Sequence, residues 1–277
     1  MNRYDFIYLF DVLDANPNGD PDAGNLPRID PETGQGLTTD VMLKRKIRNY
    51  VQTVNGDTSP NKIYVQTREI ALSTERKPAT EQKAKSPKDF MCEHYFDVRA
   101  FGAVMSMKEA NCGQVRGPVQ LSFARSIDRI VTAEHAITRC SAETEKEINK
   151  ETGDNRTMGR KFTVPYALYR AHGFINPFLA AQTGFSDADR ELLFTALENA
   201  FQFDQSAARP AGSMNPRGLL VFEHSSQLGG APSHKLFESV TVVRKPEVEV
   251  PRAFSDYEVR IDEAGVPAGV KLIRRPV

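Results

Sequence analysis

The residues best suited to bind a charged ligand are four cations within five positions: Lys44, Arg45, Lys46 and Arg48. Like charges at this spacing repel one another along a helix, and an anionic partner would relieve that cost. They follow a long loop rich in Pro, Gly, Asn and Asp, residues 16–36. So long a loop is uncommon inside a compact domain unless it is functional. The stretch favours phosphate binding, with a solvated basic face as the alternative.

Carboxylates are the second group that could do chemistry. Asp20, Asp22 and Asp30 lie in the same loop, and Asp11 lies near the end of the apolar segment 4–13 that precedes the loop. Carboxylates beside a phosphate site can hold a divalent metal for phosphodiester cleavage. The sequence Asn-Gly-Asp-Pro-Asp is also ordinary turn chemistry. We expect a structural turn here, with the metal site kept as the alternative.

Other catalytic patterns are missing from the sequence. It contains no G-x-S-x-G, H-E-x-x-H, Walker A or G-x-G-x-x-G motif. Cys92 and His94 form its one close pair of metal-binding residue types, with no second pair to complete a zinc site. The sequence therefore predicts no catalytic residue, no metal ligand and no cofactor.

Composition limits the partners. Lys plus Arg equals Asp plus Glu, at 36 each in 277 residues, so there is no global basic field and any polyanion site must be local or shared between subunits. No run of 18 apolar residues exists, and the N-terminus does not resemble a signal peptide. The three cysteines are widely spaced. We expect a cytoplasmic protein with no membrane association.

A helix must position the four cations. Thr38 or Thr39 can cap its start, and Asp40 suits the positive N-terminal end. The backbone N–H groups at that end point outward and could hold a phosphate. Apolar residues recur at helical spacing and should face the core: Leu43, Ile47, Tyr50, Val51 and Val54. The cations should flank or oppose this stripe.

Strands are predicted on both sides of this helix. Residues 4–13 are apolar on both alternating faces, as in a central strand buried on two sides. Residues 62–73 alternate and are also predicted as strand, whereas the charged residues 74–88 should be solvated. Residues 89–107 should hold helix. A strand over 119–127 should place Val119, Leu121 and Phe123 on one face and Gln120, Ser122 and Ala124 on the other.

The second half contains one segment that should leave the body of the protein. Residues 132–161 hold almost nothing that could pack in a core, which indicates a protruding hairpin or arm. Strands are predicted at 162–175 and 219–223, and the tail 235–277 alternates like edge strands. A helix is predicted over 186–203, where Ser186 and Asp189 form a capping pattern.

The order of these elements gives the fold class. A β–α–β unit, a long insertion, then β, α and β is the order of an α+β, ferredoxin-like or RNA-recognition-type sheet with large insertions. Leu219 and Val221 stand where such domains need stacking aromatics. If RNA binds, it should therefore bind through its backbone, with its sequence unread.

Several stretches together resemble a known family. They include NPNGDPDAG, LPRIDPETG, GLTTDV and LKRKIRN within 16–49, GPVQLSFARSID at 117–128, HAITRC at 135–140, MGRKFTVPY at 158–166 and SMNPRGLLVFEHS at 213–225. In this order they resemble the backbone subunit of type I-C CRISPR surveillance complexes (Cascade), a member of the repeat-associated RNA-binding (RAMP) superfamily. The matches run along nearly the whole chain.

The resemblance implies a single domain, 1–277, with a modified RNA-recognition palm. Helical fingers would insert at 74–110, a β-hairpin thumb at 132–161, and the strands of 235–277 would complete the palm. Several copies would stack along one CRISPR RNA beside other Cascade subunits, and each thumb would kink the guide and flip out one base. The remaining bases would be free to pair with target DNA.

The resemblance also keeps one enzymatic alternative open. Related type III backbone subunits are metal-dependent RNA endonucleases with a catalytic Asp in the loop before the equivalent helix. The matching position here falls near Gly24 and Asn25, with Asp22 close but displaced. This departure argues against cleavage, so we expect a non-catalytic subunit.

The predicted RNA contacts come from the spacing of charges and from the matching stretches. The basic helix, the strand at 119–127 and the return of the arm supply most of them, and Met158 is expected to wedge beside a displaced base. The full set is Asn18, Arg28, Thr39, Lys44, Arg45, Arg48, Gln120, Ser122, Arg125, Arg139, Met158, Arg160, Lys161 and Met214.

Overall fold

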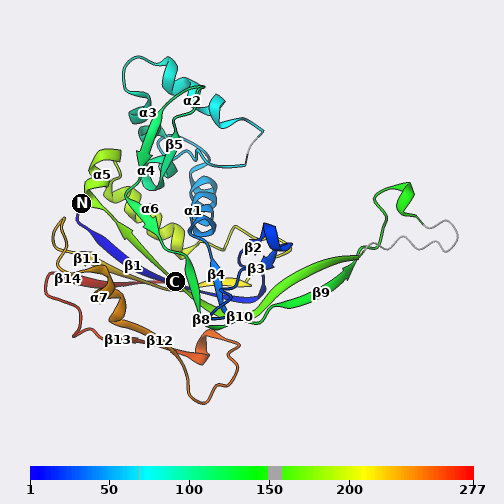
Figure 1. Ribbon diagram of the computed structural model, residues 1–277. Coiled ribbons are helices and arrows are strands. Elements are labelled where there is room, and N and C mark those ends of the chain that lie inside the picture. Colours follow the sequence, from blue (N-terminus) through cyan, green and yellow to red (C-terminus); the bar gives the residue numbers. More distant parts are fainter. Residues whose placement is uncertain (68, 149–157) are drawn as a thin grey trace.

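The computed structural model describes residues 1–67, 69–148 and 158–277, and one antiparallel sheet organises them (Figure 1). Its strands follow the order β14-β11-β1-β10-β8-β4, and β7 and β9 also pair with β10. Their bounds are β1 (Tyr4–Ala15), β4 (Gln35–Thr38), β7 (Val119–Leu121), β8 (Ala124–Arg129), β9 (Ala133–Thr138), β10 (Met158–Ile175), β11 (Met214–His224) and β14 (Val270–Arg275). The model is thus a mixed α/β structure built on a large antiparallel sheet.

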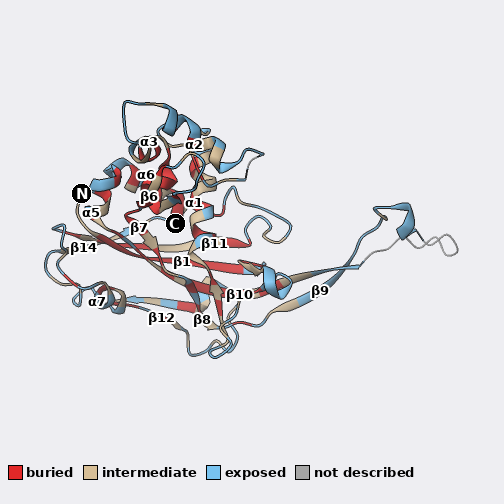
Figure 2. Cartoon of the chain, turned by 45° about the horizontal axis from the view of Figure 1, so that its top comes forward, coloured by how far each residue is buried: buried red, intermediate tan, exposed pale blue. Residues whose placement is uncertain are grey.

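Strand β1 lies in the middle of this sheet, as its apolar sequence predicts. It pairs with β10 on one side and β11 on the other. Phe6, Tyr8 and Phe10 point into the core on one face, whereas Ile7 and Leu9 belong to a second core on the opposite face. Because both faces are covered, the strand is apolar at successive positions (Figure 2).

Helices α1 (Asp40–Asn55), α5 (Pro177–Thr183) and α6 (Asp187–Glu198) cover one face of the sheet (Figure 1). Leu43, Ile47 and Val51 of α1 are buried, as predicted, but Val54 is 56% exposed. Lys46, predicted to flank the apolar stripe, is 3% exposed instead. It forms an ion pair with Asp204, and burial lowers the pKa of its ammonium.

The other face carries a smaller layer of α7 (Ser233–Glu238), β12 (Val240–Arg244) and β13 (Tyr257–Ile261). β12 and β13 form a separate two-stranded sheet. The predicted C-terminal strands are therefore divided, since only β14 joins the main sheet. Phe222 and Leu220 of β11 are buried beneath this layer, which leaves that face of the sheet unavailable for stacking with bases.

A helical unit with its own small core is inserted between α1 and β7. It contains α2 (Leu72–Glu81), α3 (Pro87–His94), α4 (Phe96–Phe101), β5 (Gly102–Met105) and β6 (Gly113–Arg116). Its core includes Tyr64, Met91 and Val98. Residues 74–88, predicted as a solvated excursion, instead contain most of α2, where Arg76 and Ala79 are buried. The predicted insertion at 74–110 lies inside this unit.

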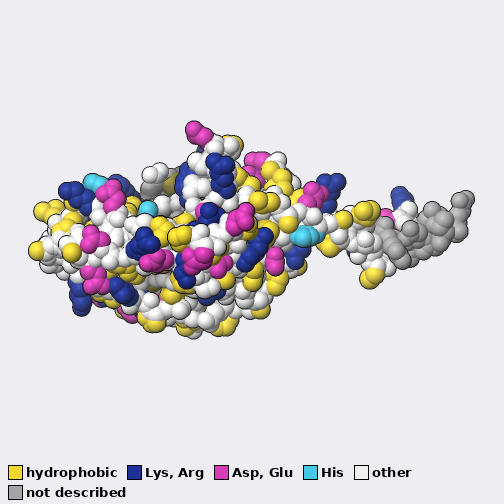
Figure 3. All heavy atoms as spheres, turned by 90° about the horizontal axis from the view of Figure 1, so that it is seen from below, with side chains coloured by type: hydrophobic (Ala, Val, Ile, Leu, Met, Phe, Trp, Pro, Cys, Tyr) yellow, Lys and Arg dark blue, Asp and Glu magenta, His cyan; other side chains and the backbone are white. Residues whose placement is uncertain are grey.

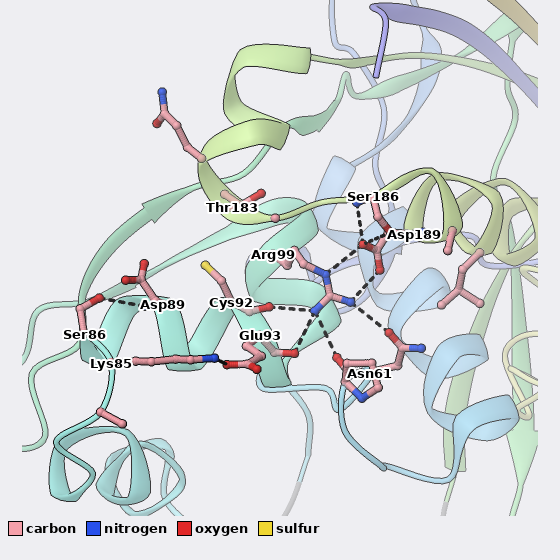
Figure 4. A pocket seen from close by; sticks show the side chains of 16 residues that line it. Asn61, Lys85, Ser86, Asp89, Cys92, Glu93, Arg99, Thr183, Ser186 and Asp189 are labelled. Carbon is pink, nitrogen blue, oxygen red and sulfur yellow. Dashed lines mark hydrogen bonds and ion pairs between the residues drawn. The ribbon is translucent and has the colours of Figure 1, made fainter.

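One buried ion pair joins the helical unit to α6. Nη2 and Nε of Arg99 donate to the two carboxylate oxygens of Asp189 at 2.6 and 3.0 Å. Asp189 also completes the predicted capping box with Ser186. The pair lines a 920 Å³ pocket between the two parts (Figure 4). Arg99 also donates to the carbonyl of Cys92 and to the side chain of Asn61, so the polar groups of this pocket already have hydrogen-bond partners. The pocket therefore marks a joint between the helical unit and α6.

The predicted arm is a two-stranded ribbon that leaves the body of the protein (Figures 1 and 2). Its register runs from Thr163 opposite Ala133 to Met158 opposite Thr138. The residues beyond the ribbon are described up to position 148. β10 continues from the ribbon into the core, so the arm and the centre of the sheet share one strand.

Two strand predictions were wrong. No strand forms over the described residues of 62–73, because the Asp97 carboxylate accepts the backbone N–H groups of Tyr64 and Val65 that a ladder would have used. The strand predicted at 119–127 is split into β7 and β8. The break shifts the alternation by one residue, so Phe123 is 54% exposed and Ala124 is buried.

Some boundaries also moved. β11 begins at Met214 rather than 219, and α6 ends at Glu198 rather than near 203. The loop at 16–36 is more ordered than expected, because β2 (Gly19–Asp20) pairs with β3 (Leu26–Pro27) and β4 joins the main sheet. No helix in the described residues is long and apolar enough to span a membrane.

The hydrogen bonds that the buried Asp97 carboxylate accepts give the first prediction. Its carboxylate is 1% exposed and accepts from Arg48 as well as from the two backbone amides. Asp97→Ala should lower the free energy of unfolding by roughly 3 kcal/mol, because it leaves a mostly buried cation and two amides without their acceptor. The exposed Asp89→Ala should cost less than about 1 kcal/mol. Urea unfolding of both variants measures this, and equal losses would contradict the role of Asp97.

Candidate nucleic-acid interface

The start of α1 gathers three of the sequence-predicted contacts. Thr39 caps the helix, accepting from the backbone N of Met42 at 3.2 Å. Its own N–H and hydroxyl donate to Oδ1 of Asn18 at 2.9 and 3.1 Å. Arg28 lies in the same loop, 3.2 Å from Asp20. The loop and the helix start therefore form one polar surface that combines a helix N-terminus with a cation.

Strand β4 connects this surface to Arg125. Leu37 of β4 lies opposite Arg125 in β8, and Leu37 is two residues before Thr39, the cap of α1. Arg125 forms an ion pair with Asp30, and its side chain is 53% exposed. The guanidinium holds the pKa of the Asp30 carboxyl below its ordinary value. An exposed pair of this kind contributes little stability, so a phosphate could replace the carboxylate at small cost.

The four cations of α1 have different surroundings. Arg45 is exposed, whereas Lys46 is buried with Asp204. Lys44 pairs with Asp40 at 2.8 Å. Arg48 is only 12% exposed and donates to the buried Asp97 at 2.8 Å, so it already has a structural role. Of the predicted contacts on this helix, Arg45 is the most accessible to a ligand.

The arm carries a separate group of predicted contacts. Met158 is 79% exposed. Arg160 pairs with Glu134 at 2.8 Å across the ribbon while 72% exposed, and Lys161 lies opposite His135. Arg139 lies beyond the ribbon, 3.0 Å from Glu147. β3 lies against β10, which brings the base of the arm to the loop that holds Arg28.

Three predicted contacts are placed less favourably. Met214 is 5% exposed and packs in the main core, so its side chain has little surface to offer RNA, and its contact remains a prediction. Gln120 donates to the carbonyl of Gly117 at 3.1 Å, near the helical unit and away from the arm. Ser122 accepts from the backbone N of His172 at 2.9 Å. Gln120 and Ser122 remain predictions.

Ser122 and Arg125 instead lie beside a cleft of 890 Å³ between the β7–β8 edge and the α7–β12 layer. In its wall the His172 ring stacks on Phe237, with centroids 4.2 Å apart and planes at 6°. Arg170 donates to Nε2 of His172 at 2.9 Å, so the imidazole is neutral and its proton is on Nδ1. Burial, and secondarily the Arg170 charge, lower the pKa of His172 to about 4.

The loop carboxylates do not gather into a metal site. Asp20 faces Arg28, Asp30 faces Arg125, and Asp11 is 1% exposed beside Arg217. Within the described ranges no group of three or more His, Cys, Asp or Glu side chains could hold a metal ion. Cys92 and Cys112 are buried free thiols, and Cys140 is an exposed one.

Sequence reasoning missed the loop after α6. Asp204 binds Lys46 and Asn49 of α1, and Arg209 reaches Asp204 at 3.6 Å and the carbonyl of Asn16 at 3.5 Å. Among the described residues, six buried side-chain polar atoms lack a hydrogen-bond partner, and three of them belong to Asn16, Arg28 and Arg209. This junction is therefore where ordered water is expected. Only the Pro and Gly content of 209–218 hinted at it.

Comparisons with known proteins place the chain in a family. A family model described as CRISPR-associated protein Cas7 matches residues 2–262. A CRISPR-associated protein Cas7 from Haloferax volcanii is 28% identical over 250 residues, 81% of this chain and 71% of the relative.

Two solved structures share the fold. A chain of a "CRISPR RNA-guided surveillance complex, pre-nicking" gives a TM-score of 0.53 at 12% identity and covers 83% of this chain and 80% of that one. A chain of a "CRISPR RNA-guided surveillance complex" gives 0.50 at 15% identity, with 83% and 71% covered.

The His172 environment gives the second prediction. Its pKa of about 4 lies below the ordinary 6.5, so between these pH values the unfolded chain binds a proton that the folded chain rejects. The free energy of unfolding should therefore fall as pH drops from 6.5 towards 4. In His172→Asn, whose amide oxygen can still accept from Arg170, this fall should be smaller. Urea unfolding at pH 7 and 4.5 tests it, and the same fall in both proteins would refute the assignment.

Proposed function

We propose, because this chain belongs to the CRISPR-associated Cas7 family, that it is a non-catalytic guide-RNA-binding backbone subunit of a type I-C surveillance complex. Copies would assemble along the CRISPR RNA, next to other Cascade subunits, and present the guide to target DNA. The observation that supports this best is a polar edge in which Asn18, Thr39 and Arg28 lie close to Arg125, where β3 reaches the base of the arm. Arg45 is exposed farther along α1.

The architecture supports an RNA-recognition-type palm. The sheet order β11-β1-β10-β8 with α1 and α6 on one face is that of a ferredoxin-like fold in which β7 and β8 take the place of its second strand. The face that such domains use for base stacking is covered by α7, β12 and β13. RNA would thus lie along the polar edge, and phosphate contacts would carry its affinity. The helical unit and the arm would act as fingers and thumb.

A subunit that repeats along a guide has no need to read its sequence. Specificity would come from base pairing between guide and target, so the protein would contact the backbone of every segment alike. Charges of both signs are mixed over the face in Figure 3 rather than gathered in one basic field. The arm would cross the guide, with Met158 beside a displaced base and Arg160 and Lys161 near the flanking phosphates.

The proposed phosphate contacts yield the third prediction. The double variant Arg45→Ala, Arg125→Ala should bind single-stranded RNA about tenfold more weakly at 0.15 M salt, by a similar factor for unrelated sequences. The slope of log affinity against log salt should fall by about 1.4, the amount expected for two lost contacts. Fluorescence anisotropy across a salt series measures both quantities.

Arg260→Ala is the matched control, because this arginine is 60% exposed and paired with Glu258 on β13, away from the polar edge. It should leave the affinity and the slope unchanged. A loss confined to particular RNA sequences, or an equal loss in the control, would contradict the assignment.

The enzymatic alternative is a metal-dependent RNA endonuclease that uses the loop carboxylates. The pairing of Asp20 and Asp30 with arginines supports the non-catalytic proposal. We predict that protein assembled on a guide leaves a complementary RNA intact in the presence of Mg²⁺, as followed by denaturing gel electrophoresis. Cleavage that Asp22→Ala abolishes would establish the endonuclease instead.

A further inference from the structure

Two arginines lie directly opposite each other in the 890 Å³ cleft. Arg125 of β8 and Arg170 of β10 are register partners in antiparallel strands, so their side chains leave the same face of the sheet, and both line the cleft. The Cβ atoms of such a pair are about 5 Å apart, and like charges at this spacing destabilise the sheet. An anion bound between the two guanidinium groups would relieve this repulsion.

The charge of Arg170 has no counter-charge among the described residues. Its Nε donates to His172, and its Nη1 and Nη2 donate to the carbonyls of Val240 and Phe237 at 2.7 and 2.6 Å. All three acceptors are neutral, and burial lowers the pKa of the guanidinium. A guanidinium has five N–H groups, so two of those of Arg170 have no acceptor in the described part of the chain.

The other polar groups of the cleft wall also favour an anion. The neutral His172 ring accepts from Arg170 at Nε2 and carries its proton on Nδ1, so it adds a further N–H donor. Glu238 is the one carboxylate among the residues that line the cleft, and it is exposed. Asp30 pairs with Arg125 through an exposed contact that water screens. No buried carboxylate in the described wall therefore opposes an anionic ligand.

Phe123 adds a flat apolar surface between these polar groups. The backbone N of Ser122 donates to the carbonyl of His172 at 2.8 Å. Arg125 pairs with Arg170 farther along, so Phe123 lies in the break between these two pairings. Phe123 lines the cleft and is 54% exposed. An exposed ring of this kind is a stacking surface for a planar base.

We propose that the cleft binds a nucleoside monophosphate, with its phosphate between Arg125 and Arg170 and its base on Phe123. The charges favour this ligand, because a phosphomonoester carries nearly two negative charges at neutral pH, whereas a backbone phosphodiester carries one. The volume of 890 Å³ lies in the range of small-molecule sites. A free nucleotide and the phosphorylated end of a strand share this chemistry. The inference goes beyond the proposed function, which needs only contacts to the RNA backbone.

Calorimetric titration of the full chain with AMP tests the site. At about pH 7.5 the phosphate of AMP is mostly dianionic, since its second pKa is near 6. AMP should bind about tenfold more tightly than adenosine, which lacks the charge, and than inorganic phosphate, which lacks the ring. Cyclic AMP, whose phosphodiester carries one charge, should also bind about tenfold more weakly than AMP.

Two exposed side chains carry the mutational test, because Arg170 also holds the α7–β12 layer. Phe123→Leu keeps an apolar side chain but removes the ring, so it should weaken AMP binding about tenfold. Arg125→Gln removes one of the two charges. It should weaken AMP binding about tenfold and abolish the preference for AMP over cyclic AMP. Circular dichroism checks that both variants fold.

Phe203→Leu and Arg274→Gln are the matched controls. Phe203 is 60% exposed beside Tyr50 of α1. Arg274 pairs with Glu263 and belongs to β14, at the other end of the sheet from the cleft. Both controls should bind AMP like the wild type. An equal loss in the controls, or unchanged affinity in the two cleft variants, would overturn the inference.

Competition distinguishes the two sources of the ligand. An RNA tetramer with a terminal phosphate that displaces AMP, while its unphosphorylated counterpart does not, identifies a strand end. If neither tetramer displaces AMP, the ligand is the free nucleotide. Equal displacement by both would show that the RNA backbone occupies the cleft, and it would overturn the inference.

The inference and the proposed function fail separately. A wild-type protein that binds RNA in the anisotropy assay but not AMP would overturn the inference and leave the proposed function standing. A wild-type protein that binds AMP but no RNA would contradict the proposed function alone.

Discussion

The pairing of β10 with its neighbours is the constraint on which the rest of the structure depends. This 18-residue strand pairs with β1 in the core, with β7 and β8 at the edge, and with β9 in the arm. At about 3.3 Å per residue it spans roughly 60 Å. Its inner half is fixed by the two apolar cores, so the direction of the arm is set by the centre of the sheet. The packing of the core therefore determines the direction in which the arm leaves the body.

The cations of this chain fall into two groups, buried and exposed. Buried cations hold the architecture: Lys46 with Asp204, Arg48 with Asp97, and Arg99 with Asp189. Exposed cations such as Arg125 and Arg160 have carboxylate partners that water screens. Removing a partner from the first group would destabilise the fold, whereas the second group can exchange partners. A neutral protein can in this way keep a local surface for polyanions.

The sequence predicted elements whose signal is local. The capped helix α1, the capping box of α6, the central strand β1 and the protruding ribbon all followed from spacing and composition. The sequence-based predictions failed where a side chain distant in the sequence determined the local structure. Asp97 takes the amides of 64 and 65 and removes a predicted strand, and Asp204 draws Lys46 into the interior. Met214, named as an RNA contact within a matching stretch, is buried because β11 begins there. The site's helix start was predictable, but its pairing with Asn18 was not.

The joint at Arg99 bears on how such proteins diversify. The helical unit has its own core, and the buried pair of Arg99 with Asp189 is its principal ionic link to α6. Asp189 belongs to the capping box of α6, so the acceptor is held in place by α6 alone. A foreign helical insert could therefore be grafted here if it presents an arginine at the same point. Lineages could exchange this module while the edge that we propose for RNA binding stays untouched.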